Sequence, residues 1–256
     1  MFNFPVAAGT SGHLLGGVLA GFLLGPWAGS VVMATVIGIQ ALLFQDGGLL
    51  ALGANIFNMG VIGTLGGTLV ARGIATTLGN ARRATLFGVG SAAWLSVMAA
   101  AGFTTLQLGL SGTTDISIGL PAMLGTHALI GLGEALISVS AASFIAISAP
   151  EIFAKSAPAA PTSPRRRVAA GLIITAATVS LASLFTSASP DGLQKIATDL
   201  GFINKSQAAP FEIFAGYKIF GITGSLGTLI AGLLGVFAVA AVIVLLNKFA
   251  SKRKGS

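Results

Sequence analysis

The feature that most constrains this chain is a series of long apolar runs without a charged side chain. No Lys, Arg, Asp or Glu occurs before Asp46, and further uncharged runs of 18 or more residues follow. About 20 such residues are enough to cross a bilayer as a helix. Charged residues make up 8% of the chain, against about 25% in an ordinary soluble domain. The sequence therefore indicates an integral membrane protein.

Seven apolar segments can be distinguished, and they predict an all-α, polytopic bundle of transmembrane helices. The segments are 14–24, 27–44, 49–72, 84–107, 118–148, 168–186 and 220–247. The first is too short to span a membrane alone, and Gly25-Pro26 should stop or bend it. We expect it to join residues 1–8 in a broken element that lines a cavity, because irregular backbone at membrane depth is tolerated only where protein buries it or a cavity adjoins it.

Basic residues lie in short segments between the apolar ones, which is a pattern of membrane topology. They form three clusters, at 72–83, 155–167 and 248–254. Seven crossings place all three on one side, which the positive-inside rule makes the cytoplasm. The C-terminus is then cytoplasmic, whereas His13 and the loops 45–48, 108–117 and 187–219 face outside. We expect a multi-pass protein of the cell membrane, and the net charge of +7 does not indicate a nucleic-acid partner.

The stretch 150–167 is rich in Pro, Ala and Ser, and it predicts a flexible cytoplasmic linker between two domains. Residues 1–149 would form a first transmembrane domain. Residues 168–256 would form a second, in which two helices are joined by the outer loop 187–219. The chain has no cysteine, so disulfides and thiolate metal sites are excluded.

His13 is the leading candidate for chemistry. It lies between the turn Gly9–Gly12 and a glycine-rich helix, and no acidic residue occurs within thirty positions of it. An unpaired polar group away from water costs free energy, so this imidazole needs a partner. Neutral imidazole is the commonest metal ligand and suits nickel, cobalt, copper and zinc. The alternative is a histidine that simply bonds a neighbouring carbonyl.

Several other polar side chains fall inside the apolar segments. His127 and Glu134 are seven residues apart, so they share one helix face about 10 Å apart along its axis. They could form a relay or a second ion site, but packing and hydrogen bonding are favoured, with Glu134 near the cytoplasmic end. Asn55 and Asn58 could bond another helix or help to orient His13. The residues expected to support a metal ion at His13 are Ser11, Asn55 and His127.

A rival interpretation is an intramembrane serine protease. Gly9-Thr10-Ser11-Gly12 has the form G-x-S-G, and His127 follows on a later helix. Rhomboid-type proteases resemble this arrangement, with a serine nucleophile and a helix-borne histidine as base. The match covers four residues, other rhomboid features are absent, and His13 directly follows it. We therefore expect a protein that is not an enzyme.

Three long motifs occur in order and resemble the CbiM/NikM family. They are F-P-V-A-A-G-T-S-G-H-L-L-G-G, Q-A-L-L-F-Q-D-G-G-L-L-A-L-G-A-N-I-F-N-M-G and H-A-L-I-G-L-G-E-A-L. This family comprises the substrate-binding membrane subunits of energy-coupling-factor (ECF) transporters for cobalt and nickel. The run P-D-G-L-Q, with its flanking helices, resembles the PDGLE/NikN-type domain often fused to them, and Gln194 stands where that motif has Glu.

The resemblance implies a helical bundle like those of ECF substrate-binding subunits, with no ATPase of its own. It implies capture of Ni²⁺ or Co²⁺ at the outer face, as a transported ligand and not as a cofactor. The implied partners are a transmembrane coupling subunit and two ATPase subunits. The sequence does not separate nickel from cobalt, and an ECF subunit for another small solute remains an alternative.

The resemblance also implies a ligand set. In the family the metal is held by the N-terminal amine, by the second residue's histidine with its backbone nitrogen, and by a histidine in the S-G-H loop, which His13 matches. A square-planar, all-nitrogen site favours nickel or copper over calcium or magnesium. Family members begin with Met-His and a further segment before F-P-V, whereas Phe2 follows Met1 here. We therefore expect that the family's N-terminal segment is missing and that His13 is the one ligand supplied.

Overall fold

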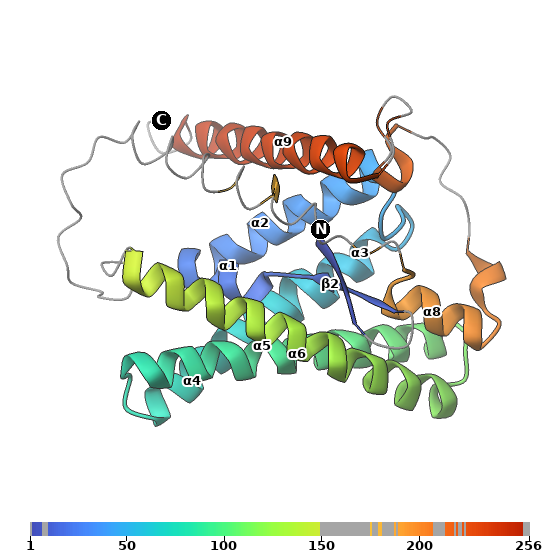
Figure 1. Cartoon of the computed structure of the whole chain (residues 1–256), viewed down its shortest axis with the longest axis horizontal. Helices are drawn as coiled ribbons and strands as arrows, with labels where there is room; N and C mark the ends of the chain where they lie inside the picture. The colour runs from blue at the N-terminus through green and yellow to red at the C-terminus, as the bar shows by residue number, and fades with distance from the viewer. Residues whose placement is uncertain are drawn as a thin grey trace.

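Figure 1 shows a computed structural model of the chain, in which long helices pack around one small hairpin. The structure describes residues 2–6, 10–148, 175, 179–180, 187, 189–206, 213–217, 219, 222 and 224–252. The predicted linker 150–167 and most of the apolar segment 168–186 lie outside these residues. The predicted all-α bundle is confirmed, because five of the described helices are long and apolar enough to cross a membrane.

The elements follow one another with few long loops. In chain order they are β1 (Phe2–Pro5), β2 (Ser11–Leu14), α1 (Gly17–Leu24), α2 (Pro26–Ile39), η1 (Gln40–Phe44), α3 (Leu52–Asn55), η2 (Ile56–Gly66), α4 (Gly67–Thr77), α5 (Arg82–Leu110), α6 (Ile116–Ser148), α8 (Gly192–Asp199), η4 (Ile203–Lys205), η5 (Ala215–Tyr217) and α9 (Gly224–Lys252). The π-helical turn η1 continues α2, and π-helical η2 joins α3 to α4, so each of these runs forms one span.

The short first helix, α1, behaves as the sequence predicts. It ends at Leu24, Gly25 follows as its C-cap with a φ of 88°, and Pro26 then begins α2. Glycine on α1 allows close packing, because a Cβ added at Gly17 would lie 2.6 Å from Oγ1 of Thr64 on η2. Gly21 has no room for a Cβ either, since Thr68 lies against it. Gly17 and Gly21 therefore form a packing face of α1 against η2 and α4.

The hairpin β1–β2 differs from the expected turn and helix around His13. Four residues of β2 pair antiparallel with β1, and the register sets Asn3 opposite His13. Two four-residue strands leave too short a pattern to identify from hydrophobic period. The sequence predicts irregular backbone beside a cavity; the backbone is instead extended and regularly paired, and His13 on β2 lines a cavity.

The centre of the bundle is built from small residues. One core cluster contains Val18, Ala71, Val89, Ala92, Ala93 and Ala142, contributed by α1, α4, α5 and α6. Small side chains let helix backbones approach closely, which is how helices pack in a membrane. A second cluster joins Phe44 at the end of η1 to Ile219 and to Ala231 on α9. The C-terminal part of the chain therefore packs on the first part beside residues 39–44.

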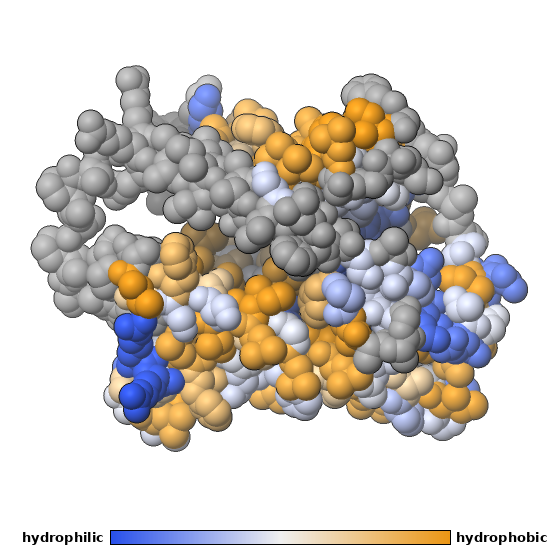
Figure 2. Space-filling model, in the orientation of Figure 1, coloured by the Kyte–Doolittle hydropathy of each residue, from blue (hydrophilic) through white to orange (hydrophobic). Residues whose placement is uncertain are grey.

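The two ends of the bundle differ in character. The loop between α4 and α5, the C-terminal end of α6 and the C-terminal end of α9 lie together at the left in Figure 1, and α8 lies toward the right. Figure 2 shows an apolar surface over the middle of the bundle, with hydrophilic side chains at the α4–α5 end and near α8. Arg82 and Arg83 begin α5 at the left end. This grouping agrees with the predicted placement of basic residues at one end.

Candidate metal site

The strand β2 is held along both of its edges, and this fixes the position of His13. One edge pairs with β1. On the other side, the Ser11 amide donates to the Pro190 carbonyl at 2.9 Å, and the Ser11 hydroxyl donates to the Ser189 carbonyl at 2.8 Å. Ser11 is fully buried. Its hydroxyl thus serves to attach residues 189–191 to β2, which is not the environment of a catalytic nucleophile.

Glu134 of α6 holds the end of β2. Its Oε2 accepts a hydrogen bond from the Leu15 amide at 2.8 Å, and its Oε1 accepts one from the Gly16 amide at 2.7 Å. The side chain is 1% exposed. These contacts support the packing role favoured from the sequence. The expected location near the cytoplasmic end is wrong, because Glu134 lies near the middle of α6 and beside the His13 strand.

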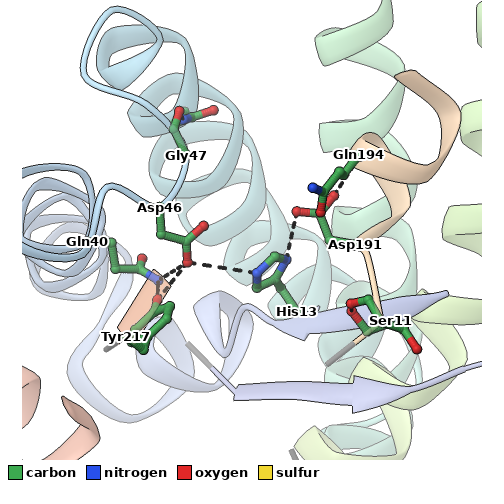
Figure 3. A network of polar contacts seen from close by, with 10 residues as sticks. Ser11, His13, Gln40, Asp46, Gly47, Asp191, Gln194 and Tyr217 are labelled. Atoms are coloured by element: carbon green, nitrogen blue, oxygen red, sulfur yellow. Dashed lines mark hydrogen bonds and ion pairs between the residues drawn. The ribbon is translucent and has the colours of Figure 1, made fainter. Parts of the chain in front are cut away.

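Folding places two carboxylates beside the His13 ring (Figure 3). Oδ2 of Asp46 lies 3.9 Å from His13 Nε2, and Oδ2 of Asp191 lies 3.9 Å from His13 Nδ1. The three side chains are 22%, 24% and 30% exposed for His13, Asp46 and Asp191. His13 is isolated from acidic residues in the sequence but not in space, so this part of the sequence argument is wrong.

Asp46 is oriented by a tyrosine from the C-terminal part of the chain. The Tyr217 hydroxyl donates to Asp46 Oδ2 at 2.6 Å, and Gln40 Nε2 lies 3.4 Å from the same oxygen and 3.3 Å from the hydroxyl. The Tyr217 ring stacks on Phe44 with centroids 4.8 Å apart. Burial, followed by the nearby Asp46 charge, raises the pKa of the Tyr217 hydroxyl well above its usual range. The hydroxyl therefore stays protonated and acts as a donor.

Backbone strain is concentrated around Asp46. Gln45, which precedes it, has a φ of 54°, and Tyr217 has a φ of 60°. Left-handed backbone is uncommon for residues of this size and costs about 1–3 kcal/mol each, so it persists only where the surroundings enforce it. Here the enforcing contacts include the amide of Asp46 bonded to the Gln40 carbonyl at 3.1 Å and the Phe214 amide bonded to the Leu43 carbonyl at 2.9 Å.

Asp191 and Gly192 owe their positions to the start of α8. Asp191 is the N-cap residue, and its Oδ1 accepts from the Gln194 amide at 2.8 Å. A Cβ added at Gly192 would lie 2.8 Å from His127 Cε1 and 2.9 Å from Ile130 Cδ1, so a larger residue would push α8 away from α6. The P-D-G run thus places a carboxylate beside His13 and a bare backbone against His127.

His127 and Asn55 line the same cavity as His13. His127 Nδ1 lies 2.8 Å from the Met123 carbonyl, and because a carbonyl only accepts, Nδ1 carries the proton of the neutral ring. The Asn55 amide donates to the Gly47 carbonyl at 2.7 Å and so holds the loop that carries Asp46. Asn58 also lines this cavity, but its amide is bonded to Thr104 and Gln107 of α5.

The cavity has a volume of about 180 Å³ and is lined by both polar and apolar side chains. Its polar lining residues include His13, Gln40, Asp46, Asn55, His127 and Asp191. Among the residues that the structure describes, no Lys or Arg forms an ion pair with either of the two aspartates. Nor does any group of three His, Asp or Glu in that part of the chain lie close enough together to hold a metal ion. The site consists of His13 paired on each side with one carboxylate.

Sequence reasoning identified His13 and three residues around it but missed Asp46, Asp191 and Tyr217. Two of the missed residues had a local signal: Asp46 ends the uncharged stretch, and Asp191 lies in the P-D-G run. Neither signal says which residues meet. Tyr217 and Asp46 are separated by 171 positions, and no spacing rule spans such a distance.

Residues 1–152 match the family model described as "Cobalt uptake substrate-specific transmembrane region" (CbiM), and residues 165–252 match the PDGLE domain. The chain belongs to the CbiM family. The resemblance drawn from the three motifs and from P-D-G-L-Q is thereby confirmed. Because CbiM is a family of transporter components, the chain is not an enzyme, and the protease interpretation is set aside.

Individual relatives agree with this membership. A protein of Archaeoglobus fulgidus named "Putative fused nickel transport protein NikMN" is 35% identical over 258 residues, covering 98% of this chain and 82% of that protein. The "Fused nickel transport protein NikMN" of Rhodobacter capsulatus is 32% identical over 63% of this chain and 51% of its own length. A crystal structure described as a transition metal transporter is 31% identical, with a TM-score of 0.51, over 58% of this chain and 70% of that one.

Proposed function

We propose that this CbiM-family chain captures Ni²⁺ or Co²⁺ in the pocket around His13, at the outer face of the cell membrane, for uptake into the cell. Three kinds of support point to it. The family model concerns cobalt uptake, and relatives carry names that refer to nickel transport. The structure places an imidazole and two carboxylates around one cavity.

The observation that carries the proposal is the position of His13 between Asp46 and Asp191. Two carboxylates without a Lys or Arg partner among the described residues make the pocket electronegative, which favours a cation. Imidazole selects transition metals over calcium and magnesium, which prefer oxygen ligands alone. A pocket with this mixed donor set therefore suits Ni²⁺ and Co²⁺.

The supporting residues have distinct parts in this proposal. Ser11 fixes the strand that carries His13, Asn55 holds the loop that carries Asp46, and His127 lines the cavity.

The proposal includes two domains and external partners. Residues 1–149 form the metal-capturing domain, 150–167 a cytoplasmic linker, and 168–256 a domain that contributes Asp191 and Tyr217 to the pocket. The first family match ends at residue 152 and the second begins at residue 165, so both boundaries fall in the linker region, which supports this division. The chain has no phosphate-binding loop of the G-x-x-x-x-G-K-[ST] type. Energy for transport then comes from an ECF coupling subunit and two ATPase subunits.

The direct test is isothermal titration of Ni²⁺ and of Co²⁺ into the purified full chain, its His13→Ala variant and a control, Asp115→Asn. Asp115 is an exposed residue that bonds Ser117 at the start of α6, and it does not line the cavity. We expect binding by the wild type and the control and none by His13→Ala. Equal affinities for all three would overturn the proposal.

The placement at the outer face has its own test. The chain lacks cysteine, so single cysteines can be introduced at Ala81, in the α4–α5 loop, and at Ser206, near α8; both positions are exposed. In intact cells a membrane-impermeant thiol reagent should label Ser206→Cys but not Ala81→Cys. The reverse labelling pattern would place the pocket on the cytoplasmic side.

A further inference from the structure

We propose that a groove between α5 and α6 binds one anionic phospholipid, with an acyl chain in the groove and the phosphate at Arg82 and Arg83. The two helices lie side by side (Figure 1), and every residue that lines the groove belongs to one of them. The groove has a volume of about 610 Å³. It shares no lining residue with the His13 cavity, so it is a second site for a different kind of ligand.

Small residues between larger ones form the groove. Gly90 of α5 and Ala135 of α6 lie on it. At the floor the two helices touch, because a Cβ added at Gly90 would lie 2.7 Å from Val139 Cγ2. The walls are apolar side chains that are themselves exposed, among them Phe87 at 61% and Leu132 at 55%. Both helices are long and apolar enough to cross a membrane, so these side chains face lipid and acyl chains can enter the groove.

Trp94, near the middle of α5, closes one end of the groove. Its ring lies across on α6, since a Cβ added at Gly131 would lie 2.9 Å from Trp94 Cδ1. Its Nε1 donates to the Ala128 carbonyl at 3.0 Å. Because the indole N–H already has its partner, the ring can face an acyl chain without a lost hydrogen bond.

Two arginines lie at the other end of the groove, where α5 begins. Arg82 reaches across to α6, with its Nη2 3.5 Å from the Ser143 carbonyl. Arg83 precedes Leu86 and Phe87, which line the groove, by three and four residues. Residues at this spacing share one face of a helix, so Arg83 continues the groove face of α5 toward its first turn. Side chains of α5 that reach α6 thus mark both ends of the groove.

The two guanidinium groups suit a phosphate. Both side chains are exposed, and in the part of the chain that the structure describes neither forms an ion pair with a carboxylate. A guanidinium offers five N–H donors and matches the geometry of a phosphate, so the contact of Arg82 with α6 leaves other donors for a ligand. The groove therefore combines an apolar body with a phosphate-binding end, as an anionic phospholipid requires.

The length of the groove corresponds to one leaflet of a bilayer. From Leu86 to Leu95 the helix rises by about 14 Å, and half of the hydrocarbon core of a bilayer is about 15 Å. An acyl chain likewise begins at the headgroups and ends at the middle of the membrane. A transmembrane helix of another protein would cross both leaflets, whereas this groove is closed by Trp94. The groove therefore fits a lipid better than a partner helix.

The experiment uses Trp94 as the reporter. The chain has two tryptophans, so Trp27→Phe leaves Trp94 as the only source of tryptophan fluorescence. The full chain with this substitution is reconstituted in phosphatidylcholine vesicles with increasing fractions of phosphatidylglycerol that is brominated on its acyl chains. Bromine quenches tryptophan fluorescence at short range. Compared with brominated phosphatidylcholine, the quenching curve gives the relative affinity of the groove for the anionic lipid.

We expect a preference for phosphatidylglycerol of about fivefold for each arginine, from the usual attraction of a basic residue to anionic lipid. Arg83→Gln should lower the preference by about fivefold. Arg72→Gln is the matched control, because Arg72 is an exposed arginine of another helix, α4, and it should lower the preference far less. Ser91→Leu, which fills the groove from α5, should reduce quenching by both lipids. Thermal unfolding of each variant reports whether the fold is intact.

Three results would overturn the inference. Equal quenching by the two brominated lipids at equal fractions would mean that Trp94 contacts only the bulk bilayer. Equal losses of preference in Arg72→Gln and Arg83→Gln would mean a general effect of surface charge and no site. A Trp94 that neither lipid quenches would mean that protein, and not lipid, covers the groove.

Discussion

Glu134 and Asp46 are two carboxylates of the same domain in opposite situations. Glu134 is 1% exposed, and each of its oxygens accepts a backbone amide from the residues that follow β2. Asp46 is 24% exposed, bonds a tyrosine hydroxyl through one oxygen and faces an imidazole across a cavity. The first carboxylate has its partners within the protein, whereas the second still has positions for a ligand.

The comparison separates position in the membrane from function. An ionisable residue inside a transmembrane helix is a functional candidate by default. Glu134 meets that description, yet its contacts make it an anchor for the strand that carries His13. Asp46 lies in a loop at a helix end and lines the cavity that we propose for the metal ion. What decides between the two is whether the carboxylate oxygens are already bonded.

The largest effect is expected from Glu134→Ala. It would leave the amides of Leu15 and Gly16 without their acceptors, at about 1–3 kcal/mol each, so we expect a loss of about 2–6 kcal/mol in the free energy of unfolding. Thermal unfolding in detergent measures it. Glu134→Gln keeps the side-chain volume and one acceptor oxygen, so its free energy of unfolding should fall by less than that of Glu134→Ala. A Glu134→Gln protein of wild-type stability that no longer binds Ni²⁺ would break the comparison.

The second-largest effect is expected from Gly192→Ala, which tests the contact between the P-D-G run and α6. The added Cβ would lie 2.8 Å from His127 Cε1, so α8 must shift. We expect about 1–3 kcal/mol of destabilisation, typical of overpacking, and weaker Co²⁺ binding because Asp191 moves with α8. Gly201→Ala, where nothing lies within 4 Å of the added atom, controls for space, although its φ of 77° adds strain. Unchanged Co²⁺ affinity in Gly192→Ala would separate Asp191 from the pocket.

The sequence predicted the membrane helices well. The apolar segments 84–107 and 118–148 correspond to α5 and α6, which run over Arg82–Leu110 and Ile116–Ser148. These boundaries are predictable because a lipid-facing helix tolerates few charges, so charged and turn residues mark its ends. His13 was also predictable, since a single imidazole in an uncharged stretch requires a partner.

The partners of His13 were not predictable by the same reasoning. Asp46, Asp191 and Tyr217 come from three segments, and their meeting depends on how the C-terminal part packs on η1. Hydrophobic period describes one helix at a time and contains no information on contacts between distant segments. The hairpin β1–β2 was missed for a related reason, because it is fixed by Glu134 and by residues 189–191, not by its own pattern.

A smaller effect is expected from Asn58→Ala. The Asn58 amide bonds Thr104 and Gln107 on α5, and such bonds between membrane helices contribute about 0.6–1.7 kcal/mol. Thermal unfolding should show a loss of that size with Ni²⁺ affinity unchanged. Asn55→Ala is the matched comparison, because Asn55 holds the Asp46 loop through Gly47 and should lower affinity instead. If the two variants behaved alike, the distinction between asparagines bonded to another helix and those that support the pocket would fail for the span formed by α3, η2 and α4.

The smallest effect is expected from Gln194→Glu, which restores the residue that the PDGLE motif has at this position. Gln194 is the third residue of α8, and its backbone amide donates a hydrogen bond to the Asp191 side chain (Figure 3). Gln and Glu serve equally at this place in a capping box, so the substitution leaves the cap intact. The added charge favours a helix N-terminus but lies near Asp191, and these two effects oppose each other. We expect the free energies of unfolding and of Co²⁺ binding each to change by less than about 0.5 kcal/mol, as for other surface substitutions. Differential scanning calorimetry measures the first and isothermal titration calorimetry the second. Gln194→Ala is the control for loss of the side chain. A clear gain in Co²⁺ affinity for Gln194→Glu would mean that a third carboxylate reaches the pocket.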